Sequence, residues 1–167
     1  MFREMRRRRQ ALTRKENEAV LAETTSGTLA LLGDDGYPYA VPVSHAYYDG
    51  KLYFHSATEG HKTDALSRND KVSFCAVERD RVVPEEFTTY FRSTIVFGRA
   101  RILTDRDEKR TVLEKLGTKY SPDDPTGLQT EIEKGIDRSA VIEIIIEHMT
   151  GKEAIELARQ KHGNRRL

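Results

Sequence analysis

The dipeptide Asp49–Gly50 lies between two runs of apolar and aromatic residues, and it constrains the fold more than any other feature of the sequence. A two-residue hairpin turn of type I′ needs positive φ at both central positions, which Asp and Gly tolerate well. Both flanking runs alternate, as half-buried strands do. We therefore predict a β-hairpin with one strand over residues 39–48 and a second over residues 51–57.

The second strand leads into a short loop and then into a predicted helix over residues 62–67. The N–H groups and the dipole of a helix N-terminus favour an anion, and Lys62 adds a positive charge. Gly60, His61 and Lys62 therefore form a candidate phosphate site. An ordinary surface loop is the alternative, because Gly-His-Lys is a short motif that many loops contain.

The other predicted elements are mainly strands separated by Gly, Asp and Pro. Six or seven short strands with few helices favour an antiparallel barrel over repeated βαβ units. Gly98 is predicted to mark a β-bulge or a close approach. Capping boxes are predicted at Thr13–Glu16 and Asp105–Glu108. The predicted strands are 28–32, 39–48, 51–57, 71–78, 88–103 and 139–148, and the predicted helices are 13–24, 62–67, 104–120 and 151–160, with a helical turn at 130–135 and a loop at 122–127.

The 167 residues are expected to form a single domain, residues 1–167, with a basic N-terminal arm at 1–10 and a frayed tail at 161–167. With 28 basic and 27 acidic residues, the formal net charge is +1, so the chain as a whole has no bias towards nucleic acid. The arm contains Arg3 and Arg6–Arg9. Nucleic-acid contact is one interpretation of this run, and a solvated terminus is the one we favour.

The remaining composition favours a cytoplasmic protein. No apolar run approaches the length of a membrane span or a secretion signal. The single cysteine, Cys75, cannot form an internal disulfide and is expected to be a small core residue.

The five histidines show neither HExxH spacing nor a Cys/His cluster, so we expect no metal site. In the predicted hairpin Tyr48 pairs with Lys51, which places His45 and His55 on opposite faces. His45 is expected to be a half-buried, hydrogen-bonded histidine. Ser56 has no identifiable base or orienting acid, so a serine hydrolase is not indicated.

Six segments, in this order and spacing, resemble the pyridoxamine 5′-phosphate oxidase-like split-barrel flavoproteins, and among them the nitroimidazole-resistance type. The resemblance extends over roughly residues 6–157. The segments are Tyr39–Ser44, Tyr53–Ala57, Gly60–Lys62, Asn69–Phe74, Tyr90–Gly98 and Met149–Lys152.

The resemblance implies a mainly β fold, a six-stranded antiparallel split barrel with flanking helices, and a homodimer with two FMN molecules at the subunit interface. By this resemblance Val41, Pro42, Val43 and Ser44 line the flavin ring. His55, Ser56 and Ala57 flank the ribityl chain and phosphate. His61 and Lys62 bind the phosphate, and Tyr90, Arg92 and Ser93 reach the cofactor from the other subunit.

The function implied is a flavin-dependent oxidoreductase that passes electrons from a reduced nicotinamide or another donor to a small acceptor, with nitro compounds as one candidate class. The tail at 159–167 shows no convincing version of the arginine and histidine motif of true pyridoxamine phosphate oxidases, so that activity is not expected. The alternatives are a non-catalytic flavin- or haem-binding protein, a deazaflavin-dependent reductase and an interaction module whose arm binds nucleic acid.

Overall fold

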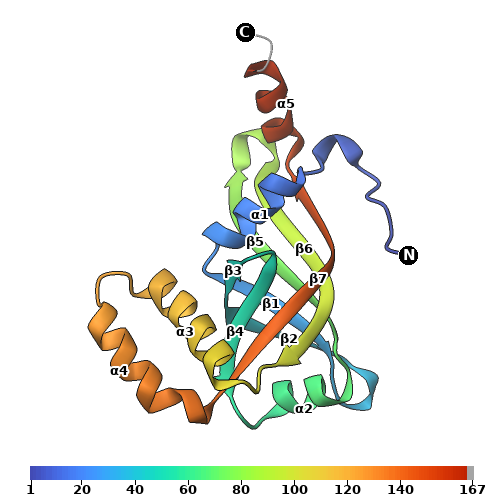
Figure 1. Cartoon of the computed structure of the whole chain (residues 1–167). Helices are drawn as coiled ribbons and strands as arrows, with labels where there is room; N and C mark the ends of the chain where they lie inside the picture. Colours follow the sequence, from blue (N-terminus) through green and yellow to red (C-terminus); the bar gives the residue numbers. More distant parts are fainter. Residues whose placement is uncertain (165–167) are drawn as a thin grey trace.

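The computed structural model describes residues 1–164. One antiparallel sheet has the strand order β2-β1-β5-β6-β7-β4-β3 and is flanked by helices (Figure 1). The predicted mainly β split barrel is confirmed, with seven strands instead of six. The strands are β1 Ser26–Leu32, β2 Pro38–Ser44, β3 Ala46–Tyr48, β4 Lys51–Ala57, β5 Lys71–Val83, β6 Thr88–Ile102 and β7 Ser139–Glu153; the helices are α1 Arg14–Glu23, α2 His61–Arg68, α3 Arg106–Tyr120, α4 Pro125–Gly135 and α5 Ile155–Asn164.

The additional strand arises because the chain changes partner at His45. β2 pairs with β1 at one edge of the sheet order, whereas β3 pairs with β4 at the other edge. The two edges of the sheet are therefore consecutive segments of one chain, joined at His45. The predicted hairpin is confirmed, with Tyr48 opposite Lys51.

His45 is completely buried at this junction, where the sequence predicted half burial. Its Nε2–H donates a hydrogen bond to the Leu21 carbonyl at 2.9 Å, and its ring meets Phe74 edge-on at 4.8 Å. Its backbone N–H donates to the Tyr120 hydroxyl at 2.9 Å, which supplies a partner where the ladder is interrupted. Its Nδ1 has no hydrogen-bond partner within the described chain.

The protein should lose stability in acid through His45. Burial, followed by the nearby charge of Lys119, lowers the pKa of His45 from 6.5 to about 4. The unfolded chain therefore takes up the proton first, so this contribution is complete above pH 6.5 and is lost as the pH falls towards 4. The loss should reach about 2 to 3 kcal/mol.

The measurement is urea unfolding between pH 7 and pH 4 (roughly the range in which histidine titrates), with His45→Gln as the matched variant. Gln keeps an N–H donor near the Nε2 position but does not titrate. A smaller fall in the free energy of unfolding in the variant is expected. Equal falls in both proteins would contradict the assignment to His45.

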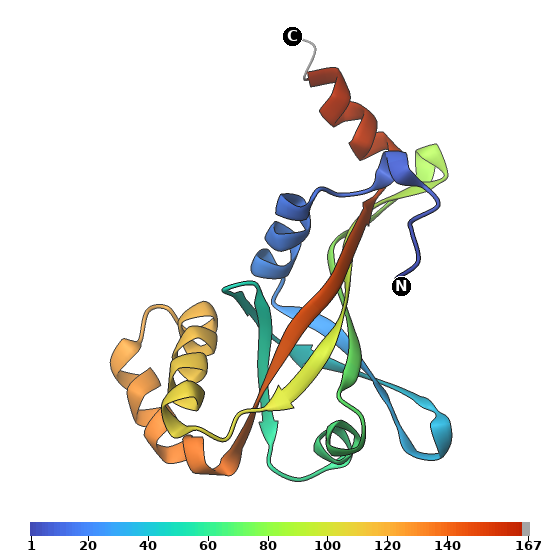
Figure 2. The same ribbon diagram turned by 45° about the vertical axis from the view of Figure 1, so that its right-hand side comes forward.

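β5 and β7 are longer than predicted, and with β6 they extend the sheet well beyond the barrel (Figure 2). β6 ends at Ile102, one residue before its predicted end. The β5–β6 ladder continues to Val83 opposite Thr88, and β7 remains paired with β6 as far as Glu153. Gly98 marks a register shift in β6, as predicted. An added Cβ there would lie 2.3 Å from the Ile145 carbonyl oxygen, so the site accepts only glycine without a backbone shift.

The helices agree with the sequence near their capping residues and differ elsewhere. Thr13 and Glu16 form the predicted capping box, and the Asp105 side chain accepts from two N–H groups at the start of α3. α4 begins inside the predicted loop at 122–127 and continues through the predicted turn at 130–135. The loop prediction was therefore wrong for residues 125–127, and the predicted turn is part of a longer helix. α5 begins at Ile155 and continues to Asn164, so residues 161–164 of the predicted tail are helical. Residues 165–167 lie outside the described residues.

Apolar side chains fill two regions. The barrel interior holds Leu29, Phe54, Phe74, Val96 and Ile142, with less than 2 % of each exposed. A second cluster lies between α3 and the outside of the barrel and contains Ala46, Tyr53, Leu103, Val112, Leu116 and Val141. This second cluster fixes the helical pair α3–α4 beside β4. None of the helices in residues 1–164 is long and apolar enough to cross a membrane.

Candidate functional site

Two pockets adjoin β4, one polar and one apolar. The polar pocket, with a volume of about 200 Å³, lies where β4 ends and α2 begins. It brings together four of the predicted phosphate-side residues, Ser56, Ala57, His61 and Lys62. The full lining is Tyr39, Ser56, Ala57, Glu59, Gly60, His61, Lys62 and Thr63; Tyr39, Glu59 and Thr63 were not singled out from the sequence.

Gly60 is the N-cap residue of α2. Its φ of 134° is one that side-chain-bearing residues rarely adopt, and its carbonyl accepts hydrogen bonds from Thr63 Oγ1 at 2.8 Å and from the Asp64 N–H at 3.0 Å. No side chain of the described chain caps the first turn of α2. The N–H groups of that turn are therefore available to an anion.

Lys62 supplies the positive charge of the polar pocket. Its ammonium lies 5.6 Å from the centre of the Phe54 ring, and partial burial lowers its pKa. No carboxylate of the described residues lies close enough to pair with it. A partly desolvated ammonium without a counter-ion gains from a bound anion, so this lysine is suited to a phosphate.

His61 has a different environment from Lys62. Its ring stacks on Tyr39 with the centroids 4.1 Å apart, and its Nε2 lies 3.5 Å from the Asp34 carboxylate. Asp34 also binds Arg68 at 2.5 Å. His61 is thus held against the turn between β1 and β2 and forms a wall of the polar pocket.

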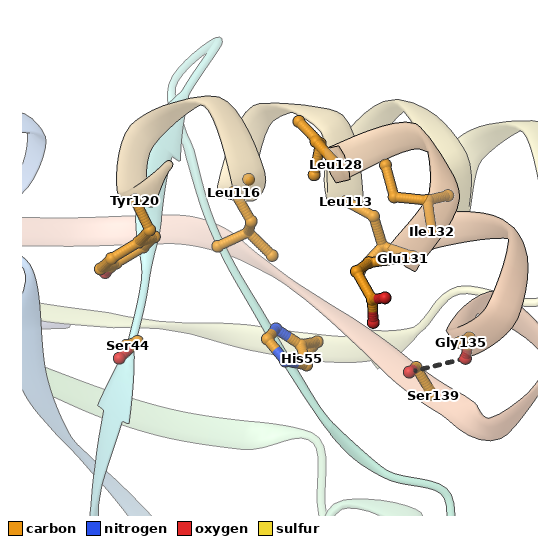
Figure 3. Close-up of a pocket in the computed structure, with 11 residues that line it drawn as sticks. Ser44, His55, Leu113, Leu116, Tyr120, Leu128, Glu131, Ile132, Gly135 and Ser139 are labelled. Carbon is orange, nitrogen blue, oxygen red and sulfur yellow. Dashed lines mark hydrogen bonds between the residues drawn. The ribbon is translucent and has the colours of Figure 1, made fainter. Parts of the chain in front are cut away.

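The apolar pocket, with a volume of about 340 Å³, lies between the α3–α4 pair and the strands (Figure 3). Leucine and isoleucine side chains project from the helices, while Ser44, His55 and Ser139 come from β2, β4 and β7. Gly117 allows the helices to approach, since a Cβ there would lie 2.0 Å from Leu128 Cδ1. The lining is Ser44, His55, Leu113, Leu116, Gly117, Tyr120, Leu128, Glu131, Ile132, Gly135 and Ser139.

His55 is the titratable side chain that β4 contributes to the apolar pocket. Desolvation, followed by the charge of Lys62, lowers the pKa of His55 below its ordinary value of 6.5. The ring is therefore neutral at pH 7 and offers one hydrogen-bond donor and one acceptor. It precedes Ser56, which lines the polar pocket, so consecutive residues of β4 contribute to both pockets.

The helical wall of this pocket was only partly predicted from the sequence, because residues 125–129 of α4 were not predicted to be helical. The signals were present in the chain. Asp124 caps α4 by accepting the Gly127 N–H at 2.8 Å, and Pro125 follows it at the first helical position. Leu128 and Ile132 are four residues apart, which places them on one helical face.

The predicted ring-binding strand alternates between two environments. Val43 is buried, and Val41 packs against the barrel interior. Pro42 and Ser44 are exposed on the other face. Of these four, Ser44 lines the apolar pocket together with His55.

Tyr90, Arg92 and Ser93 lie far from both pockets within the protomer. Arg92 is opposite Glu153 at the end of β7, whereas Ala57 of the polar pocket is opposite Ser139 at its start. At about 3.3 Å per residue these two points are roughly 45 Å apart along the strand. Arg92 binds the Glu153 carboxylate through Nε at 3.2 Å and Nη2 at 3.1 Å, so one protomer alone does not bring it to Lys62.

Within the described chain, His, Cys, Asp and Glu side chains form no group of three or more that could hold a metal ion. A family model does match the chain. It is described as pyridoxamine 5′-phosphate oxidase, and the match covers residues 13–153. This chain belongs to that family. The predicted family is therefore confirmed. A comparison with curated proteins found no match to the chain.

Solved structures with the same fold include several relatives of the pyridoxamine 5′-phosphate oxidase family. A protein assigned to 5-nitroimidazole antibiotic resistance, from Bacteroides thetaiotaomicron, is 24% identical, with 85% of each chain covered and a TM-score of 0.71. An FAD-binding protein from Mesorhizobium loti is 27% identical, with 87% of this chain and 97% of that chain covered and a TM-score of 0.61. An FAD- and haem-binding protein from Mycobacterium smegmatis is 21% identical, with 87% and 73% covered and a TM-score of 0.75.

Proposed function

We propose that the protein is a cytoplasmic, FMN-dependent oxidoreductase that passes electrons from a reduced nicotinamide or another donor to a small acceptor such as a nitro compound. The observation that carries the proposal is Lys62, a partly buried ammonium that has no carboxylate partner among residues 1–164 and lies beside the uncapped first turn of α2. This arrangement fits a phosphate monoester, which needs a cation and several N–H donors.

Lys62 and the first-turn N–H groups would hold the phosphate end, next to Ser56, whose hydroxyl donates to the Ala57 carbonyl at 2.9 Å. Ser44 and the exposed face of β2 would lie beside the ring. Bound FMN supplies two-electron redox chemistry, and the chain supplies position and electrostatics. Neutral His55 lies beside the proposed ribityl segment and can exchange a proton with a group in the apolar pocket.

We also propose a homodimer, because one face of the sheet has the composition of an interface. On the outer face, residues that lie opposite one another on neighbouring strands form two rows across β2, β1, β5, β6 and β7. Neither row contains Asp, Glu, Lys or Arg. The rows are Ala40, Ala30, Ser73, Phe97 and His148, and Pro42, Thr28, Cys75, Ile95 and Thr150. Absence of charge is typical of interface cores.

The proposed phosphate contact predicts a selective effect of Lys62→Ala. A charge-assisted hydrogen bond contributes about 1.5 to 3 kcal/mol, so FMN should bind about ten- to a hundredfold more weakly. Riboflavin, which lacks the phosphate, should bind with nearly unchanged affinity. Flavin fluorescence quenching measures both affinities, and Lys15→Ala on the exposed side of α1 serves as the matched control. Equal losses for FMN and riboflavin would assign Lys62 a structural role.

The function itself is tested by the absorbance of the purified protein and by anaerobic reduction. Oxidised flavin gives bands near roughly 375 and 450 nm, and NADH or NADPH should bleach them before a nitroaromatic acceptor restores them. A bound flavin that neither nucleotide reduces would indicate a non-catalytic flavin protein. A Soret band would indicate haem, and a colourless protein that takes up neither group would leave an interaction module.

A further inference from the structure

We propose that the apolar pocket beneath α3 and α4 is the acceptor site, and that it takes a neutral or cationic aromatic molecule and rejects phosphorylated and carboxylate ligands. This inference rests on the proposed function and assigns the substrate class of the same site. It is carried by the pocket's size, its position and its charge.

The size and walls of the pocket suit a small ring. A volume of about 340 Å³ is within the range of small-molecule sites. Four aliphatic side chains, Leu113, Leu116, Leu128 and Ile132, cover it from the helices (Figure 3). A flat apolar ligand would bury its faces against them, whereas an anion would lose its hydration there without a cation in the lining to compensate.

The position of the pocket places it next to the proposed flavin ring. Ser44 ends the strand proposed to line the ring, and His55 belongs to the segment proposed to flank the ribityl chain. Both side chains line the apolar pocket. A ligand in the pocket would therefore lie beside the ring while the phosphate end remains with Lys62 in the polar pocket.

The polar groups of the lining define the charge that the pocket accepts. Glu131 is the only charged side chain among them, and it pairs with Lys134, which lies outside the lining, at 3.0 Å. No Lys or Arg is present in the lining to pair with an anionic ligand. The Ser139 hydroxyl already donates to the Gly135 carbonyl at 2.9 Å, and the Tyr120 hydroxyl donates to the Thr25 carbonyl. The hydrogen-bonding groups left for a ligand are those of Ser44 and His55.

Three nitroaromatic probes of similar size test the charge preference: para-nitrobenzyl alcohol, para-nitrobenzylamine and para-nitrobenzoate. Calorimetric titration of the FMN-loaded protein at pH 7 measures binding without turnover. The neutral alcohol and the cationic amine should bind at least about tenfold more tightly than the anionic carboxylate. Tighter binding of para-nitrobenzoate would overturn the inference, as would the absence of binding by all three.

Gly135 offers a way to fill the pocket without straining the fold. A Cβ built at Gly135 has only the Ser139 hydroxyl near it, at 4.0 Å, so a longer side chain enters open space. Gly135→Met should weaken the alcohol probe by about tenfold or more while the FMN content stays at the wild-type level. Gly135→Ala adds only one methyl group to the pocket and should weaken the alcohol probe by less than Gly135→Met does.

The outcomes separate this inference from the proposed function. Loss of FMN together with the probe in Gly135→Met would overturn it by assigning the pocket to the flavin ring. Normal probe binding in Gly135→Met would overturn it by placing the probe elsewhere. If the probes bind as expected but reduced nicotinamides transfer no electrons to them, the reductase proposal fails and the binding site stands.

Discussion

Replacing Gly98 with alanine should destabilise the protein by about 3 kcal/mol, the upper end of the range for overpacking, because the new methyl group has no space. Its Cβ would lie 2.3 Å from the Ile145 carbonyl oxygen and 2.9 Å from Ile144 Cγ2. The first of these atoms belongs to the backbone of the paired strand, so the clash is relieved only by moving β7 away from β6 at the bulge. The measurement is urea unfolding at pH 7 (roughly neutral, where most native folds are near their maximal stability).

Gly135→Ala is the matched control for this prediction. It adds the same methyl group, but its nearest neighbour would be 4.0 Å away, so the free energy of unfolding should change by less than about 1 kcal/mol. A Gly98→Ala protein as stable as the Gly135→Ala protein would show that the bulge adapts easily. Flavin content measured in parallel would show whether the sheet distortion reaches the site.

The parts of the fold that could be predicted are those encoded by neighbouring residues. The Asp49–Gly50 turn, the Thr13–Glu16 capping box and the bulge at Gly98 each depend on a few residues and on local sterics. The break at His45 could not be predicted in this way. It depends on Tyr120, which is 75 residues away, and on a change of strand partner that alternation alone does not reveal.

The candidate site likewise has one part that neighbouring residues encode and another part that depends on residues far apart in the chain. Ser56, His61 and Lys62 meet in the polar pocket because one short segment carries them, so the sequence was sufficient. The apolar pocket requires α3 to pack against β4, where Tyr53 and Leu116 share one apolar cluster, and α4 to pack against α3, where Gly117 meets Leu128. The first of these contacts joins residues far apart in the chain. The role predicted for Arg92 depends on a second subunit, which no pattern within one chain can place.

Arg92→Ala should lower the free energy of unfolding by about 3 kcal/mol, in the range for loss of one partner of a buried ion pair. The Glu153 side chain is only 3% exposed, and its carboxylate accepts two hydrogen bonds from the Arg92 guanidinium. Arg92 Nη1 also lies 3.7 Å from the Glu78 carboxylate. Lys161 remains 2.7 Å from Glu153, so the loss should be at the lower end of that range. Arg92→Lys keeps the charge without the planar fork and should cost less. An unchanged free energy of unfolding in Arg92→Ala would mean that Lys161 alone is a sufficient partner for the Glu153 carboxylate.

The same substitution tests whether Arg92 also serves the flavin of the partner subunit. If it does, Arg92→Ala and Lys62→Ala homodimers should each bind FMN weakly, although both proteins are folded in the absence of urea. Mixing and re-dimerising the two variants then produces heterodimers in which one site carries both substitutions and the other carries neither. The unaltered site should bind FMN with wild-type affinity, giving half the normal load per heterodimer.

If Arg92 acts only through Glu153, Arg92→Ala homodimers will bind FMN normally once folded, and mixing will create no site tighter than theirs. Because the roughly 45 Å along β7 prevents Arg92 and Lys62 of one protomer from sharing a cofactor, recovery on mixing can come only from opposite subunits.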